Sequence, residues 1–251
     1  MNQTKKPARI IDEYYEKVSG MLDRIIHTQR EAILRAADII TDSLRRDGIL
    51  HIFGSGHSHI LAEEIYSRAG GLVPVNAMLE GNLMLHEGPM KSTSMERLTG
   101  YAAVLLVNAR VMPEDSLIIA SNSGRNAVPI EMAYEAKKYG IRPIAITSIA
   151  HSQSVISRHP SGKRLFEIAD VVIDNCGVAG DAAVSVEGLD TAVSPTSTIT
   201  GAFIVNSIIA AVVENLTRDG VTPPIFRSAN TDGSEAHNLS IIQKYSKRIR
   251  F

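Results

Sequence analysis

Residues 49–65, ILHIFGSGHSHILAEEI, join a short apolar run to a turn with two glycines and then to an amphipathic segment. This order predicts a strand, a tight turn and a helix. Gly54 and Gly56 let the backbone turn sharply and approach a ligand closely. The helix that follows offers unpaired N–H groups and the positive end of its dipole. The turn therefore predicts an anion site, above all for phosphate, and the hydroxyls of Ser55 and Ser58 suit a phosphorylated polyol.

Two nucleotide-binding motifs also begin with such a turn. A dinucleotide fingerprint needs a third glycine and an acid after the second strand. Here His59 holds the third position, and the apolar run at residues 72–75 is followed by Asn76. A P-loop is disfavoured because no Gly-Lys-Ser/Thr follows. A glycine turn that only connects a strand to a helix remains open from this stretch alone.

Composition places the chain among ordinary globular proteins. The 251 residues are 44% hydrophobic and 21% charged, with a formal net charge of -1, which gives no general attraction to nucleic acid or membranes. The one cysteine, Cys176, excludes an internal disulfide. We find no apolar run that we judge long enough to cross a bilayer, and no signal peptide. We therefore expect a cytoplasmic protein without nucleic-acid or membrane partners.

The same pattern of strand, turn and helix recurs later in the chain. Residues 116–120, SLIIA, run into Ser121-Asn122-Ser123-Gly124-Arg125-Asn126, and a helical pattern follows at 127–139. Turns at the carboxyl ends of parallel strands face one crevice, where open α/β sheets bind ligands. A helix cap explains one polar side chain of this kind, but not several in six residues. The second turn therefore strengthens the expectation of a phosphate site.

These two turns, with a later strand that ends in Ile146-Thr147-Ser148, resemble the sugar isomerase (SIS) domain. The resemblance covers roughly residues 10–220. It implies an α/β fold, a three-layer α-β-α sandwich with a flavodoxin-like five-stranded parallel sheet and N-terminal helices. It also implies a phosphorylated sugar as ligand and a homodimer or homotetramer. Asn126 stands where many family members carry Thr, and its amide can still donate to phosphate.

The chain divides into three parts on this interpretation. Residues 1–46 form a helical segment, broken near Gly20, that packs on the core or on a dimer partner. Residues 47–220 form the SIS domain, and 221–251 add a tail and helix to it. Strands are expected to begin at Ile49 and to span 72–77, 116–120, 142–147 and 169–174. Residues 78–95 lack periodicity and suggest a lid or active-site loop.

The expected ligand contacts come from both turns and from the start of a long apolar helix that reaches about Arg218. A plain helix start explains the hydroxyls of that third group equally well. The expected binding residues are Gly54, Ser55, Gly56, His57, Ser58, Ser121, Asn122, Ser123, Gly124 and Asn126, and in second rank Ser194, Thr196 and Ser197.

Aldose–ketose isomerisation needs a base that moves a proton between adjacent carbons and an acid that assists ring opening. Glu64, Glu80 and His86 are the catalytic candidates, without a metal or cofactor. Phosphoheptose isomerases of the family carry a Glu where this chain has Arg68. Two alternatives remain: an etherase or lyase that acts on N-acetylmuramic acid 6-phosphate, and a non-catalytic phosphosugar sensor.

Overall fold

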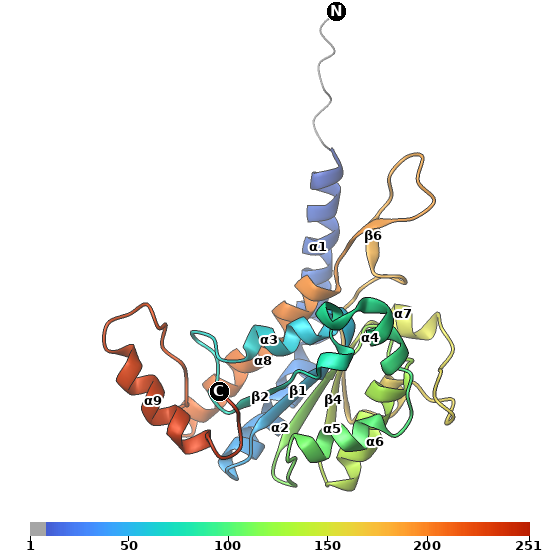
Figure 1. Cartoon of the computed structure of the whole chain (residues 1–251). Helices are drawn as coiled ribbons and strands as arrows, with labels where there is room; N and C mark the ends of the chain where they lie inside the picture. The colour runs from blue at the N-terminus through green and yellow to red at the C-terminus, as the bar shows by residue number, and fades with distance from the viewer. Residues whose placement is uncertain (1–8) are drawn as a thin grey trace, which may run out of the picture.

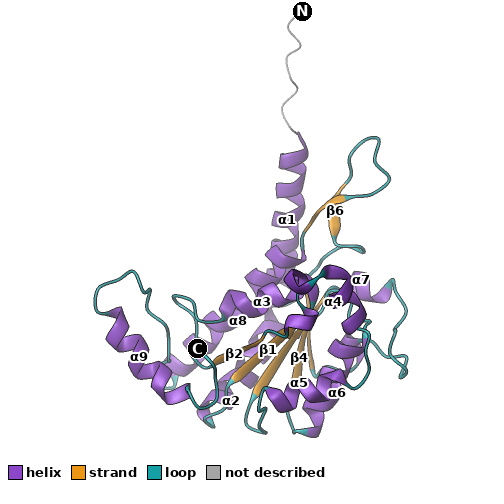
Figure 2. Ribbon diagram, in the orientation of Figure 1, coloured by secondary structure: helices purple, strands orange, loops and turns teal. Residues whose placement is uncertain are grey.

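The structure, a computed structural model, describes residues 9–251. The first eight residues of the expected N-terminal segment lie outside this range. A five-stranded sheet forms the middle layer, with helices on both faces (Figure 1, Figure 2). All of its neighbouring strands are parallel, and their order is β2-β1-β3-β4-β5. The three-layer α/β fold expected from the sequence is therefore confirmed. The strands are β1 (Leu50–Gly54), β2 (Val75–Met78), β3 (Ser116–Ala120), β4 (Pro143–Thr147) and β5 (Val171–Asp174).

The helices and the short hairpin complete the described chain. The α-helices are α1 (Arg9–Thr28), α2 (Arg30–Arg45), α3 (Ile60–Ile65), α4 (Pro89–Met95), α5 (Tyr101–Asn108), α6 (Ala127–Lys138), α7 (Ile149–Gln153), α8 (Ser197–Arg218) and α9 (Ser234–Tyr245). The 3-10 turns are η1 (Gly56–His59), η2 (Gly81–Leu83), η3 (Leu85–Glu87) and η4 (Leu165–Glu167), and the antiparallel hairpin pairs β6 (Ala182–Val184) with β7 (Val193–Pro195).

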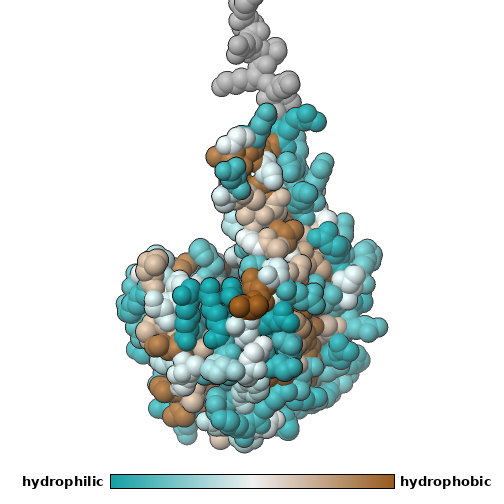
Figure 3. All heavy atoms as spheres, turned by 90° about the vertical axis from the view of Figure 1, so that its right-hand side faces the viewer, coloured by the Kyte–Doolittle hydropathy of each residue, from teal (hydrophilic) through white to brown (hydrophobic). Residues whose placement is uncertain are grey.

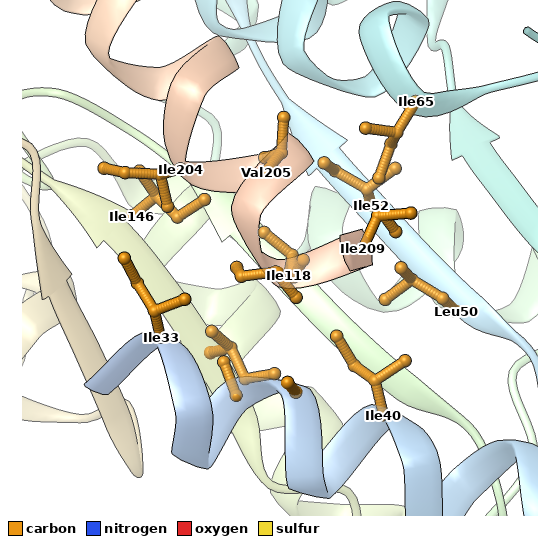
Figure 4. Close-up of a cluster of buried hydrophobic side chains, with 14 of the residues drawn as sticks. Ile33, Ile40, Leu50, Ile52, Ile65, Ile118, Ile146, Ile204, Val205 and Ile209 are labelled. Carbon is orange, nitrogen blue, oxygen red and sulfur yellow. The ribbon is translucent and has the colours of Figure 1, made fainter. Parts of the chain in front are cut away.

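One face of the sheet packs against α2, α3 and α8. Alternate strand residues point to this face, among them Ile52, Ile118 and Ile146. They meet Ile33 of α2 and Ile204 of α8 in a continuous aliphatic cluster (Figure 4). Full burial of one such side chain contributes about 1.5–3 kcal/mol, so this cluster is a main source of stability.

The other face packs against α5 and α6. Phe53, Leu117 and Ile119 point there, toward Leu106 of α5 and Val128 of α6. Because both faces are covered, the central strands are apolar at almost every position, which is typical of parallel sheets.

Helix α8 is long and apolar enough to cross a membrane by length and composition, with a mean hydropathy of 1.7 over its most apolar window. Our expectation that no such stretch exists was therefore wrong. Core helices pass the same test, and 44% of that window is buried inside the fold. Gly201 brings α8 against α3, because an added Cβ would lie 2.6 Å from Cδ1 of Leu61.

The structure corrects three element boundaries. Helix α1 continues through Gly20, and the change to α2 comes at Gln29; a single helical glycine costs only about 1 kcal/mol, too little to end a long helix. The second strand is β2, shifted from 72–77, because Leu72 pairs with Ile225 in an isolated antiparallel bridge. Residues 78–95 contain η2, η3 and α4 and are largely helical.

Helix α1 projects from the body of the molecule beside the β6–β7 hairpin (Figure 1). Its Ile11 and Tyr15 side chains are 68% and 72% exposed. Apolar patches interrupt the hydrophilic surface of this projecting column (Figure 3). The Tyr14 hydroxyl donates to the carbonyl of Pro195, so the base of the hairpin is tied to the helix.

Candidate functional site

The two glycine-bearing turns begin side by side at one edge of the sheet. Gly54, the last residue of β1, is in register with Ala120, the last residue of β3. A narrow crevice opens there, and the expected ligand residues His57, Ser58, Ser121, Asn122 and Ser197 line it. The structure therefore brings residues from both turns and from the start of α8 to one place.

The first turn depends on a glycine at its first position. A Cβ on Gly54 would overlap with the carbonyl group of Ser58 and lie 2.8 Å from the backbone nitrogen of His59. Gly56 has a φ of 53°, in the left-handed region that glycine tolerates. His57 is exposed, whereas His59 is buried and its Nδ1 contacts the carbonyl of Gly56.

We expect Gly54→Ala to lower the free energy of unfolding by about 1–3 kcal/mol, because backbone atoms of the turn must move to admit the methyl group. Urea denaturation measures the change. Gly140→Ala is not a suitable control, since the φ of Gly140 is 78°. Gly20→Ala in α1, where an added Cβ meets nothing within 4 Å, is the control and is expected to raise the free energy of unfolding by up to about 1 kcal/mol. Equal urea midpoints for Gly54→Ala and the wild type would contradict the close approach of Gly54 to the carbonyl group of Ser58.

The second turn is fixed by its own backbone. The Gly124 N–H donates to Oγ of Ser121 at 3.2 Å, and the Ser148 N–H donates to the carbonyl of Asn122 at 3.1 Å. Gly124 has a φ of 55°. The hydroxyls of Ser123 and Ser58 make no hydrogen bond within residues 9–251, so both are available to a ligand.

Two amides form part of the crevice wall. The Asn175 amide nitrogen donates to Oδ1 of Asn122 at 2.9 Å, and both residues line the crevice. Asn175 follows β5 and was not predicted from the sequence. Its location after the fifth strand, in the same position relative to the sheet as the two turns, is the signal that would have indicated it.

Glu96 connects the two turns. Its Oε1 accepts a hydrogen bond from Oγ of Ser55 at 2.7 Å, and its Oε2 accepts one from the amide of Asn126 at 2.8 Å. The Val128 N–H, in the first turn of α6, donates to the Glu96 carbonyl at 3.1 Å. Ser55 and Asn126 are each 7% exposed, so the half-buried carboxylate is held between two buried partners.

Three arginines gather beside this carboxylate. Nη1 of Arg158 donates to Oδ1 of Asn126 at 3.0 Å. Burial lowers the pKa of Arg158, and the positive charges of Arg125 and Arg97 lower it further, whereas the negative charge of Glu96 opposes them. The three arginines therefore concentrate positive charge beside the second turn. None of these arginines was predicted as a site residue.

The hydroxyls before α8 have partners inside the fold. Asp181 accepts hydrogen bonds from the Ser197 hydroxyl at 2.6 Å and from the Thr196 hydroxyl at 3.2 Å. Thr196 is buried, and Ser194, in β7, is not among the residues that line the crevice. Only Ser197 of these three lines the crevice, together with Thr198.

The predicted catalytic residues lie outside the crevice lining, as do Glu96 and the three arginines beside it. The Glu64 carboxylate pairs with Arg68 and accepts a hydrogen bond from Asn206 at 2.8 Å. Glu80 accepts one from the Asn82 amide at 2.9 Å and lines a different cavity. His86 is an exposed residue of η3. Their catalytic roles stay predictions.

The crevice has about 10 Å³ of open space, which is room for about one water molecule. A larger ligand requires side chains of the lining to move. His57 is exposed and is the side chain with most freedom to do so. Within residues 9–251, no group of three or more His, Cys, Asp or Glu side chains has the arrangement of a metal site.

Comparison with known proteins agrees with this architecture. Residues 13–148 match the SIS domain family. A UPF0309 protein of Geobacillus sp. (strain WCH70) is 43% identical over 240 residues, which is 96% of this chain and 97% of that protein. A UPF0309 protein of Listeria monocytogenes serotype 4b (strain CLIP80459) is 42% identical over the same shares of the two chains.

Two solved structures share the fold at low identity. A phosphoheptose isomerase from Francisella tularensis superposes with a TM-score of 0.55 at 16% identity, over 81% of this chain and 96% of that one. The Vibrio vulnificus NanR protein, complexed with ManNAc-6P, superposes with a TM-score of 0.51 at 14% identity, over 99% of this chain and 72% of that one. The chain thus belongs both to the SIS domain family and to the UPF0309 proteins.

Proposed function

We propose that the chain binds a phosphorylated sugar in the crevice and moves a proton between adjacent carbons of its open-chain form, as an aldose–ketose isomerase does. The observation that carries this proposal is the position of Glu96. Its carboxylate bonds to Ser55 of one turn and to Asn126 of the other, at 2.7 and 2.8 Å. Glu96 does not itself line the crevice, but it lies between the two turns, next to where a sugar would extend from a phosphate bound by them.

The second turn is the better phosphate site of the two. It offers the hydroxyls of Ser121 and Ser123, and it leads directly into α6, a 12-residue helix whose amino-terminal dipole end favours negative charge. Ser58 adds a free hydroxyl from the first turn. Hydroxyl and backbone donors of this kind bind phosphate strongly because the acceptor is charged.

The proposed chemistry needs only groups of this chain. Glu96 takes the C2 proton of the open-chain aldose, and the electrons move through C1 to the carbonyl oxygen to give an enediolate. The hydroxyl proton then passes from O2 to O1, and Glu96 returns its proton to C1 to give the ketose. His57 lies in the crevice lining and is the proposed group that protonates the ring oxygen during ring opening. No atom is gained or lost, so the reaction requires no external reactant.

The arginine cluster favours a second candidate, the etherase. Arg97, Arg125 and Arg158 suit a substrate with another anionic group besides its phosphate. The lactyl carboxylate of N-acetylmuramic acid 6-phosphate is such a group. Loss of the lactyl ether also begins with removal of the C2 proton beside the C1 carbonyl, so Glu96 serves as the base in both reactions.

A thermal-shift screen tests the binding step. We expect one or a few sugar phosphates to stabilise the protein and the unphosphorylated parents not to; a hundredfold excess over Kd adds about 2.7 kcal/mol. Ser121→Ala and Ser123→Ala remove hydrogen bonds to a charged group, each worth about 1.5–3 kcal/mol, and are expected to weaken binding by about tenfold or more.

Ser240→Ala on α9 is the control, since its hydroxyl bonds to the carbonyl of His237 far from the turns. If no sugar phosphate stabilises the wild type, the proposal is wrong. If a sugar phosphate binds at the turns but is neither converted nor exchanged at C2, the protein is a phosphosugar sensor.

Self-association and a cytoplasmic location are also part of the proposal. The exposed apolar side chains of α1, Ile11 and Tyr15 among them, support contact with a second copy of the chain. Size-exclusion chromatography with light scattering measures the assembly.

A further inference from the structure

A second cavity lies apart from the crevice, on the α5 side of the sheet. It has an open volume of about 540 Å³, and its walls are β2, the end of α5 and residues 246–250 of the C-terminal segment. This volume lies in the range of sites for small organic ligands, about 300–1,000 Å³. Among the described residues, none lines both this cavity and the crevice.

The charge of the lining is strongly positive. Arg110, Lys247, Arg248 and Arg250 line the cavity, and Glu80 is its one acidic side chain. Arg110, Lys247 and Arg250 are exposed residues, so water reaches them. The chain as a whole has a net charge of -1, which makes this local excess of cations a property of the cavity and suits an anionic ligand.

The cavity also has an apolar wall. Met78, Leu105 and Ile249 are buried residues of its lining. They offer a surface for a flat apolar part of a ligand. The charged rim and the apolar wall together suit a molecule that carries phosphate at one end and a ring at the other.

A buried chain of hydrogen bonds orients Asn76 in the wall. Oδ2 of Asp115 lies 3.0 Å from Nε2 of His51, and Nδ1 of His51 lies 3.0 Å from the Asn76 amide nitrogen. A proton on Nε2 and a lone pair on Nδ1 satisfy both contacts. The Asn76 amide nitrogen is thus turned to His51, and its Oδ1, which has no partner within residues 9–251, accepts from a ligand hydroxyl or amino group.

The C-terminal wall is anchored to the same chain of bonds. Nη2 of Arg248 donates to Oδ2 of Asp115 at 2.6 Å. The Tyr66 hydroxyl donates to the carbonyl of Arg250. Residues 246–250 are therefore held in place as one wall of the cavity.

We propose that this cavity is a second ligand site, which binds a nucleotide: phosphates at Arg110, Lys247 and Arg250, the base against the apolar wall, and a donor group at Asn76. The proposal does not depend on the function of the crevice.

Isothermal titration of the full chain with adenosine, AMP and ATP tests this site. We expect affinity to rise with each added phosphate and to fall with salt, because the rim charges are exposed to solvent. The double variant Lys247→Ala/Arg250→Ala is expected to bind ATP at least about tenfold more weakly. Lys244→Ala removes one charge from the last turn of α9, close in sequence to the cavity residues but not in the lining, and we expect ATP binding within about twofold of wild type.

Ser121→Ala distinguishes this site from the crevice and is expected to bind ATP as the wild type does. The proposal is overturned if ATP does not bind at millimolar concentration, if adenosine binds as tightly as ATP, if the double variant binds ATP unchanged, or if Ser121→Ala abolishes ATP binding.

Discussion

Replacing Glu96 by Gln is expected to slow exchange of the C2 proton of the sugar phosphate by about 10²–10⁴-fold, the usual contribution of a general base. Gln retains the size of the side chain and both of its contacts. Its oxygen accepts from the Asn126 amide, and its amide donates to Ser55, whose hydroxyl can reverse its role. The fold and the ligand affinity should therefore remain, while the ability to accept a proton is lost.

Proton NMR in D₂O measures this exchange directly, whether the reaction is isomerisation or ether elimination. Glu63→Gln is the matched control, because Glu63 lies on α3 with its side chain 49% exposed, outside the crevice lining. If Glu96→Gln exchanged at the wild-type rate while Glu64→Gln or Glu80→Gln did not, the base would be the one predicted from the sequence and the assignment of Glu96 would be wrong.

Replacing Asp115 by Asn is expected to lower the free energy of unfolding by about 3–5 kcal/mol, the cost of removing one partner from a buried ion pair. Asp115 is 4% exposed. Its carboxylate accepts hydrogen bonds from His51, Arg248 and the N–H groups of Ile49 and Met112. An amide cannot accept from all four groups, and the Arg248 charge loses its partner.

The stabilisation by Asp115 should also depend on pH. Burial raises the pKa of Asp115, but the hydrogen bonds from His51 and from the two backbone N–H groups outweigh it, so the pKa lies below its ordinary value. A carboxyl whose pKa is lower in the folded state stabilises the fold above its unfolded pKa, about 3.9. That contribution is lost as the pH falls through the lower folded value. The difference in the free energy of unfolding between the wild type and Asp115→Asn should therefore become smaller below about pH 4.

Urea denaturation across pH measures both effects. Asp170→Asn is the control, because Asp170 forms an exposed pair with Lys137 at 3.1 Å, and such pairs contribute about 0–1 kcal/mol. An Asp115→Asn variant as stable as Asp170→Asn would show that the buried network does not hold the sheet edge and the C-terminal segment together.

The fold could be predicted because its signals are local. Apolar runs such as SLIIA end at glycine and hydroxyl residues, and helical patterns follow them, so parallel pairing follows from connection geometry. The flavodoxin-like arrangement of the five strands was implied by the resemblance to the SIS domain. The boundary of the second strand, one of those that failed, depends on a distant contact. Leu72 pairs with Ile225, 153 positions later in the chain, and no local pattern announces that bridge.

The site was predicted in part for the same reason. The two turns have a sequence signature, and both reach the crevice. Glu96 has no such signature. It follows α4 in a polar stretch, and only the tertiary fold brings it between Ser55 and Asn126. His51 likewise has no sequence signature: its partners, Asp115 and Asn76, come from other parts of the chain, and only folding brings the three side chains into one hydrogen-bonded network.

The most direct test of the proposed site is a crystal structure of the protein with the sugar phosphate selected by the thermal-shift screen. We expect phosphate density on the turn from Ser121 to Gly124, within hydrogen-bond distance of the Ser123 hydroxyl, with C1 and C2 of the sugar beside the Glu96 carboxylate. Phosphate density elsewhere, for example among Arg110, Lys247 and Arg250, with the crevice empty, would contradict the proposed site.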